Sequence, residues 1–118
     1  MPDLPSSAVT VTWAGGTATM TVHGELDPVA ATEARERLAA VAGNGPQRLV
    51  LDLIGVGDRY DAESLALIAV ARHLLPPGCV LDVRSASPAV RRVLALAGWS
   101  GLDSDTGGDE PESGRDGP

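Results

Sequence analysis

The chain has 118 residues, no Phe, no Lys and a formal net charge of −7, most of which lies near its C-terminus. Residues 103–118 hold six acids and one Arg, a net −5, so residues 1–102 hold ten acids and eight Arg, a net −2. Residues 1–102 therefore lack the excess of basic residues with which a protein binds nucleic acid. The single Cys excludes an internal disulfide, and no apolar run approaches membrane-spanning length.

Composition divides the chain into three parts. Residues 1–7 form an N-terminal arm that lacks the basic residues and the apolar segment of a signal peptide. Residues 8–102 have the length of one small domain, and its core must be aliphatic because only 3% of the residues are aromatic. Residues 103–118 are rich in Gly, Asp, Glu, Ser and Pro and are predicted to be a disordered acidic tail. We expect a cytoplasmic protein without membrane insertion.

The first part of the domain predicts a β-hairpin followed by a helix. Residues 9–13 and 17–22 alternate with a period of two, and Gly15-Gly16 between them is a hairpin signal. Asp27-Pro28 is typical of a helix start, with the acid at the N-cap and Pro in the first turn. This helix is expected to reach about Ala42. The residues predicted on its inner face are Ala30, Ala34, Leu38 and Val41.

Two further strand–helix units are predicted. Residues 49–54 form a nearly continuous apolar run, which suits a strand that is covered on both faces. Asp61 is expected to cap a second helix that reaches about Leu74. Residues 79–83 form another strand, and Ser87-Pro88 starts a third helix. The residues predicted on the inner face of the second helix are Leu65, Ile68, Ala69 and, near its end, Arg72.

The predicted order, β-β-α-β-α-β-α, is typical of an α/β fold with a small mixed sheet. The hairpin adds an antiparallel edge, and right-handed βα crossovers make the later strands parallel, with helices that flank the sheet. Because the carboxyl ends of parallel strands meet at one edge, we expect the loops with Asp27 and Asp61 to be neighbours. Both acids are N-caps only, or they also belong to one recognition surface; the two interpretations are compatible.

The chain lacks the residue groups of a catalytic or metal site. His23 and His73 have no Cys or carboxylate at metal-ligand spacing. There is no Gly-x-Ser-x-Gly turn and no Gly-x-x-x-x-Gly-Lys phosphate loop. We therefore predict no enzyme activity, no cofactor and no metal. In the charged loop segment Asp58-Arg59-Tyr60, the Tyr is either a binding anchor or a lid on the following helix.

Three motifs resemble the STAS domain family. Gly24-Glu25-Leu26-Asp27 follows a predicted strand, Leu51-Asp52-Leu53 lies in the next one, and Asp61-Ala62-Glu63-Ser64-Leu65 opens a helix. The resemblance covers about residues 9–102. The family comprises anti-sigma-factor antagonists and the cytoplasmic domains of sulfate transporters, and the resemblance implies a STAS-like mixed sheet flanked by helices.

For an antagonist, the resemblance implies a partner and a switch. Antagonists of this kind bind an anti-sigma factor that is also a Ser kinase of the histidine-kinase-like ATPase type, and phosphorylation of the antagonist abolishes binding. The family pattern at the switch is Asp, Ser, Ser or Thr, Gly, Leu, and its first Ser takes the phosphate. Ala62 stands at that position and cannot accept a phosphoryl group. Glu63 either imitates part of a phosphate or only favours the helix dipole, and Ser64 is a candidate displaced phosphosite.

The resemblance therefore implies a non-enzymatic, protein-binding regulator of transcription that phosphorylation does not switch. Its partner-binding residues would be Glu25, Asp27, Asp58, Arg59, Tyr60, Asp61, Ala62, Glu63 and Ser64. The alternative is a STAS subunit of an ABC-type lipid transport system, which would dock on the ABC ATPase. A third interpretation, an enzyme or small-ligand binder that uses the same sheet edge, lacks a set of catalytic groups.

Overall fold

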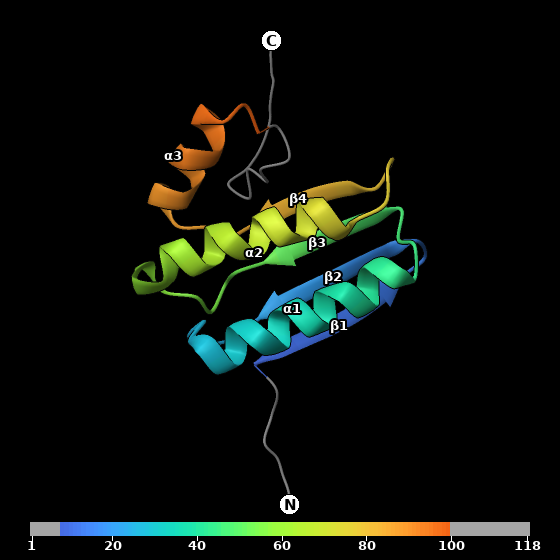
Figure 1. Ribbon diagram of the computed structural model, residues 1–118, viewed down its shortest axis with the longest axis horizontal. Helices are drawn as coiled ribbons and strands as arrows, with labels where there is room; N and C mark the ends of the chain where they lie inside the picture. The colour runs from blue at the N-terminus through green and yellow to red at the C-terminus, as the bar shows by residue number, and fades with distance from the viewer. Residues whose placement is uncertain (1–7, 100–118) are drawn as a thin grey trace, which may run out of the picture.

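The computed structural model describes residues 8–99 (Figure 1). The predicted arm, residues 100–102 and the predicted acidic tail lie outside these residues. The strands are β1 (Val9–Ala14), β2 (Thr17–Val22), β3 (Arg48–Asp52) and β4 (Val80–Arg84). The helices are α1 (Pro28–Gly43), α2 (Asp61–Leu74) and α3 (Pro88–Leu96), with a 3₁₀ turn at Asp58–Tyr60. No helix among residues 8–99 is long and apolar enough to cross a membrane.

The sheet has the order β1-β2-β3-β4 and is mixed, as the sequence predicts. β1 and β2 pair antiparallel through the Gly15-Gly16 turn, whereas the β2–β3 and β3–β4 pairs are parallel. Gly15 has a φ of 62°, a left-handed conformation that glycine adopts at little cost. Because β2, β3 and β4 are parallel, the loops that lead from them into α1, α2 and α3 all leave the same edge of the sheet.

The core lies on one face of the sheet. Alternate strand residues are buried on this face, among them Ala18, Met20, Val22, Leu49, Leu51 and Val83. Helices α1 and α2 both lie over this face, and α3 contacts α2 (Figure 1). The prediction that β3 is covered on both faces agrees with its burial, since Leu49, Val50 and Leu51 point alternately to the two faces and none is more than 4% exposed. Val50 lies on the face away from α1 and α2, and its neighbours in the sheet are Thr19 and Asp82.

Helices α1 and α3 begin as the sequence predicts. The Oδ1 atom of Asp27 accepts a hydrogen bond of 2.9 Å from the backbone N–H of Ala30. The Oγ atom of Ser87 accepts one of 3.1 Å from the backbone N–H of Val90. Each cap satisfies a donor that the first turn of a helix otherwise leaves without a partner. The predicted inner face of α1 is confirmed, since its four residues are buried: Ala30, Ala34, Leu38 and Val41.

Helix α2 begins differently from the prediction. The 3₁₀ turn runs directly into the helix, so the cap position is Tyr60, whose side chain makes no capping hydrogen bond. Asp61 is the first helical residue, and its carboxylate accepts a hydrogen bond from the Ser87 hydroxyl. The prediction that Asp61 caps α2 is therefore wrong, because a neighbouring loop supplies the partner of this carboxylate.

The predicted inner face of α2 is only partly correct. The buried residues of the helix are Ser64, Leu67, Ile68 and Ala71. Ile68 is buried as predicted and Leu65 is half-buried, but Ala69 and Arg72 are exposed. Residues 65–71 are all apolar, so their pattern defines no single stripe from which the orientation of the helix could be read.

Candidate functional site

Two loops at the carboxyl edge of the sheet are joined by hydrogen bonds. We call residues 23–27 the β2–α1 loop and residues 53–60 the β3–α2 loop. The backbone N–H of Gly55 donates to the carbonyl oxygen of Val22, the last residue of β2 before the β2–α1 loop, at 3.1 Å. The hydroxyl of Tyr60 donates to Oε1 of Glu25 at 3.3 Å. The prediction that the two loops are neighbours is confirmed.

Gly55 packs closely against the backbone of the β2–α1 loop. A Cβ atom built on Gly55 would lie 2.2 Å from the carbonyl carbon of His23 and 2.4 Å from its oxygen. It would also lie 2.8 Å from the backbone nitrogen of Gly24. All three atoms belong to the backbone, so no side-chain rotation could relieve the clash. The contact between the loops therefore requires glycine at position 55.

Tyr60 links the two loops through its side chain. Its ring packs against the edge of the core, and the guanidinium of Arg59 lies 6.0 Å from the ring centre. Loss of hydration and, next, the Glu25 carboxylate raise the pKa of the Tyr60 phenol. The phenol is therefore protonated at neutral pH and donates to Glu25. The structure places the Tyr60 hydroxyl on Glu25 in the β2–α1 loop, and the partial exposure of this side chain leaves contact with a partner available.

The Tyr60–Glu25 contact predicts a dependence of stability on pH. The raised pKa means that this contact stabilises the folded state below about pH 10 and that the stabilisation disappears as pH rises through the folded pKa. Above that pH, a phenolate would face a carboxylate. Urea unfolding of the wild type and Tyr60→Phe should therefore give free energies of unfolding whose difference is constant from about pH 7 to 9 and shrinks above pH 10. A difference that stays constant above pH 10 as well would contradict the contact.

Most of the predicted partner-binding residues lie on one exposed surface. The exposed ones are Glu25, Asp27, Asp58, Arg59, Ala62 and Glu63, whereas Tyr60 and Asp61 are partly buried. Two apolar side chains flank these residues: Val29 in the first turn of α1 is 79% exposed, and Ile54 after β3 is 68% exposed. Charged groups around apolar side chains are common at protein–protein interfaces.

The two candidate phospho-acceptor positions differ in exposure. Ala62 lies exposed in the first turn of α2, where an incoming kinase could reach it, but it carries no hydroxyl. Ser64 carries a hydroxyl but is only 3% exposed and lies on the buried face of α2. In this conformation, the exposed position therefore lacks a hydroxyl, and the position that has a hydroxyl is buried.

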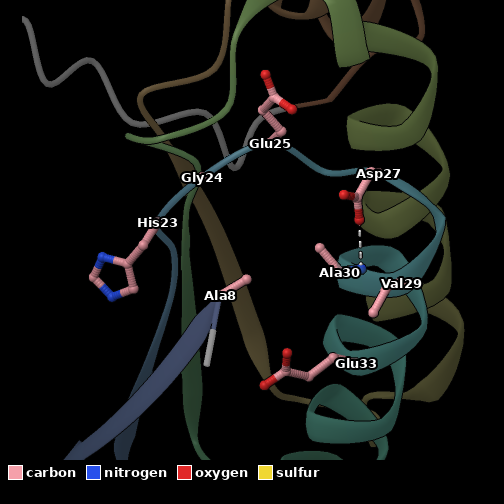
Figure 2. Close-up of a pocket in the computed structure, with 8 residues that line it drawn as sticks. All are labelled: Ala8, His23, Gly24, Glu25, Asp27, Val29, Ala30 and Glu33. Atoms are coloured by element: carbon pink, nitrogen blue, oxygen red, sulfur yellow. Dashed lines mark hydrogen bonds between the residues drawn. The ribbon is translucent and has the colours of Figure 1, made fainter. Parts of the chain in front are cut away.

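An open hollow of about 500 Å³ lies beside the β2–α1 loop, between the start of β1 and the first turns of α1 (Figure 2). The carboxylates of Asp27 and Glu33 extend from the α1 side, whereas the imidazole of His23 points away. The Nε2 atom of His23 forms a hydrogen bond of 2.7 Å with Oγ1 of Thr10. Among the described residues, no three His, Cys, Asp or Glu side chains are placed to hold a metal ion.

Sequence reasoning missed two residues of this region. Gly55 has an ordinary loop context, and no local pattern shows that a backbone segment about thirty residues earlier in the chain packs on it. Ser87 is recognisable from the sequence as a helix cap, but its second hydrogen bond, to Asp61 in another loop, depends on the tertiary structure.

Comparison with known proteins agrees with this fold. The family model described as "Mlab, STAS domain" matches residues 9–104. No curated protein sequence matches the chain. The crystal structure of an anti-sigma factor antagonist from Mycobacterium paratuberculosis is 28% identical, with a TM-score of 0.56, over 88% of this chain and 85% of the other.

Two structures of the anti-sigma factor antagonist SpoIIAA are similar in fold. The unphosphorylated form is 18% identical, with a TM-score of 0.53, over 89% of this chain and 90% of the other. The phosphorylated form, described as a Bacillus cell fate determinant, is 17% identical, with a TM-score of 0.58, over 89% of this chain and 93% of the other. The family match extends over most of the chain, and the protein therefore belongs to the STAS domain family.

Proposed function

We propose that this protein is a non-enzymatic, protein-binding regulatory module of the anti-sigma-factor-antagonist type, which acts on transcription in the cytoplasm. The observation that carries the proposal is the single exposed surface formed by the β2–α1 and β3–α2 loops and the first turn of α2. Its charged and apolar side chains suit a protein partner. The similarity to solved anti-sigma factor antagonists supports the same role.

We propose that phosphorylation does not switch this module at residue 62, the acceptor position of the family pattern. Ala62 occupies the exposed acceptor position and has no oxygen to which a phosphoryl group could be transferred. The carboxylate of Glu63 beside it adds one charge, whereas a phosphate would add about −1.5 to −2. Glu63 lies in the first turn of α2, where a negative charge is favoured by the helix dipole. We therefore assign Glu63 a local stabilising role, and the module binds its partner in an unmodified state.

The proposed partner is an anti-sigma factor with a histidine-kinase-like ATPase domain. Affinity capture from the native cell with the full chain, followed by mass spectrometry, should identify it, and binding of the purified partner can then be measured by calorimetry. Asp58→Arg combined with Glu63→Arg reverses two exposed charges of the surface without removing a contact that joins the loops. We expect this variant to weaken binding at least about tenfold, because reversed charges act directly at the interface.

A matched control separates an effect of the proposed surface on binding from an effect of the protein's net charge. Glu36→Arg reverses a charge at an exposed position two turns into α1, away from both loops and outside the lining of the hollow in Figure 2. This variant should bind like the wild type. If the reversal at Asp58 and Glu63 binds as tightly as this control, the proposed surface is wrong.

A second candidate function is supported by the description of the matching family model, "Mlab, STAS domain". In this case the chain would be the STAS subunit of an ABC-type lipid transport system and would dock on the ABC ATPase. The loss of the acceptor hydroxyl at Ala62 fits this role equally well. Recovery of an ABC ATPase, without an anti-sigma factor, in the capture experiment would favour this candidate over the first.

A further inference from the structure

A third loop reaches the same edge of the sheet. This β4–α3 loop, residues 85–87, follows the last parallel strand. The ends of β3 and β4 are tied together by a hydrogen bond of 3.0 Å from the backbone N–H of Leu53 to the carbonyl oxygen of Arg84. The loop therefore starts beside the β3–α2 loop.

Ser87 makes two hydrogen bonds through one hydroxyl. Its Oγ atom accepts from the backbone N–H of Val90 and thereby caps α3. The same hydroxyl donates to Oδ1 of Asp61 at 2.8 Å. Both side chains are partly buried, and a hydrogen bond to an ionised carboxylate is stronger than one between neutral groups. The first residue of α2 is thus held by the residue that starts α3.

The β4–α3 loop also contains an unusual backbone conformation. Ser85 has a φ of 61°, and it is the one residue other than glycine with a positive φ among residues 8–99. This conformation costs free energy for a residue with a Cβ atom, so it persists only where the surrounding structure fixes it. Here the Leu53–Arg84 bond fixes one end of the loop and the Ser87–Asp61 bond fixes the other.

We propose that Ser87 is a positioning residue: through Asp61 it holds the first turn of α2 against the β4–α3 loop, so that three loops form one partner-binding surface. The part of this inference that concerns binding rests on the proposed function. The part that concerns position is a property of the free protein. The two parts can therefore be tested separately.

The two hydrogen bonds of Ser87 can be separated by substitution. Ser87→Asp keeps an acceptor that caps α3, but it cannot donate to Asp61 and places a second negative charge beside it. Ser87→Thr keeps both the cap and the donor and is the rescue variant. If Ser87 only caps α3, Asp61→Ala, which leaves this cap in place, should behave like the wild type. If Ser87 positions α2 through Asp61, Ser87→Asp and Asp61→Ala should both differ from the wild type, and Ser87→Thr should not.

The first measurement is amide hydrogen exchange of the free, full-length protein. In Ser87→Asp, exchange across residues 58–63 should rise, whereas exchange in α1 and α3 should match the wild type. Ser87→Thr should match the wild type throughout. Asp61→Ala should reproduce the rise, and Ser87→Asp should add nothing further in that background, because the bond is already absent. Unchanged exchange in Ser87→Asp, or additive effects of the two substitutions, would overturn the positioning role.

The second measurement is the affinity for the purified ATPase-domain anti-sigma factor that the wild-type chain captures. Ser87→Asp should weaken binding about tenfold, and Ser87→Thr should restore it. Raised exchange with wild-type affinity would show that the β4–α3 loop does not shape the binding surface. If the wild-type chain binds no such factor, the proposed function fails, and the exchange measurement still decides whether Ser87 positions α2.

Discussion

Gly55→Ala should lower the free energy of unfolding by about 2 kcal/mol or more, which corresponds to roughly 10 °C in melting temperature for a domain of this size. The added Cβ would meet the backbone of His23 at 2.2 and 2.4 Å and that of Gly24 at 2.8 Å. Real Cβ atoms do not approach backbone atoms this closely, so the β2–α1 and β3–α2 loops must move apart. The hydrogen bond from Gly55 to Val22 would be lost with that movement.

The chain offers a matched control for this prediction in the same loop. A Cβ atom on Gly57 would have no heavy atom within 4 Å outside its chain neighbours, and the φ of −83° at this position is one that alanine adopts easily. Gly57→Ala should therefore change the free energy of unfolding by less than about 0.5 kcal/mol. Thermal and urea unfolding of both variants measure the difference directly. Equal melting temperatures would mean that the loops do not need their close approach.

Gly55→Ala also tests how the two loops assemble the candidate surface. If the loops separate in Gly55→Ala, the Tyr60 hydroxyl loses its position beside Glu25. Partner binding should then fall in Gly55→Ala and stay unchanged in Gly57→Ala. A variant that is destabilised but binds normally would place the partner on only one of the two loops.

The hairpin and α1 could be predicted because their signals are local. Strict alternation defines β1 and β2, and the Gly15-Gly16 turn fixes their pairing. Asp27 and Pro28 mark the start of α1, and the four residues predicted for its inner face are the ones that are buried. In both elements, propensity, pattern and tertiary contacts point to the same structure.

The second helix could not be placed as well, because its local signals conflict. The pattern in residues 65–71 is apolar on every side, and Asp61 resembles a cap from sequence alone. In the folded chain a 3₁₀ turn precedes the helix and Ser87 binds the Asp61 carboxylate.

The location of the candidate site could be predicted because it follows from topology. Parallel strands bring their carboxyl ends together, so the loops with Asp27 and Asp61 had to meet at one edge. The contacts that hold this edge together could not be predicted. Gly55 on His23 and Ser87 on Asp61 each join residues that are far apart in the chain, and no periodic pattern encodes such pairs.

Ala62→Ser should restore a phosphorylation switch. Position 62 is exposed in the first turn of α2, and the substitution adds the one atom that a kinase needs. With the ATPase-domain partner and labelled ATP, we expect transfer to the variant and none to the wild type. The phosphate would add about −1.5 to −2 charge beside Asp61 and Glu63, and the affinity for the partner should then fall at least about tenfold.

The position of this phosphate separates an effect on binding from an effect on folding. Negative charge at the N-terminus of a helix is favourable, so the phosphorylated variant should melt no lower than the unphosphorylated one. A loss of affinity without a loss of stability would therefore arise at the interface itself. Labelling of the wild type, abolished by Ser64→Ala, would instead mean that the buried Ser64 becomes accessible in the complex and that the protein retains a switch. Because Ser64 is 3% exposed in the free protein, such labelling would require the first turn of α2 to open on binding.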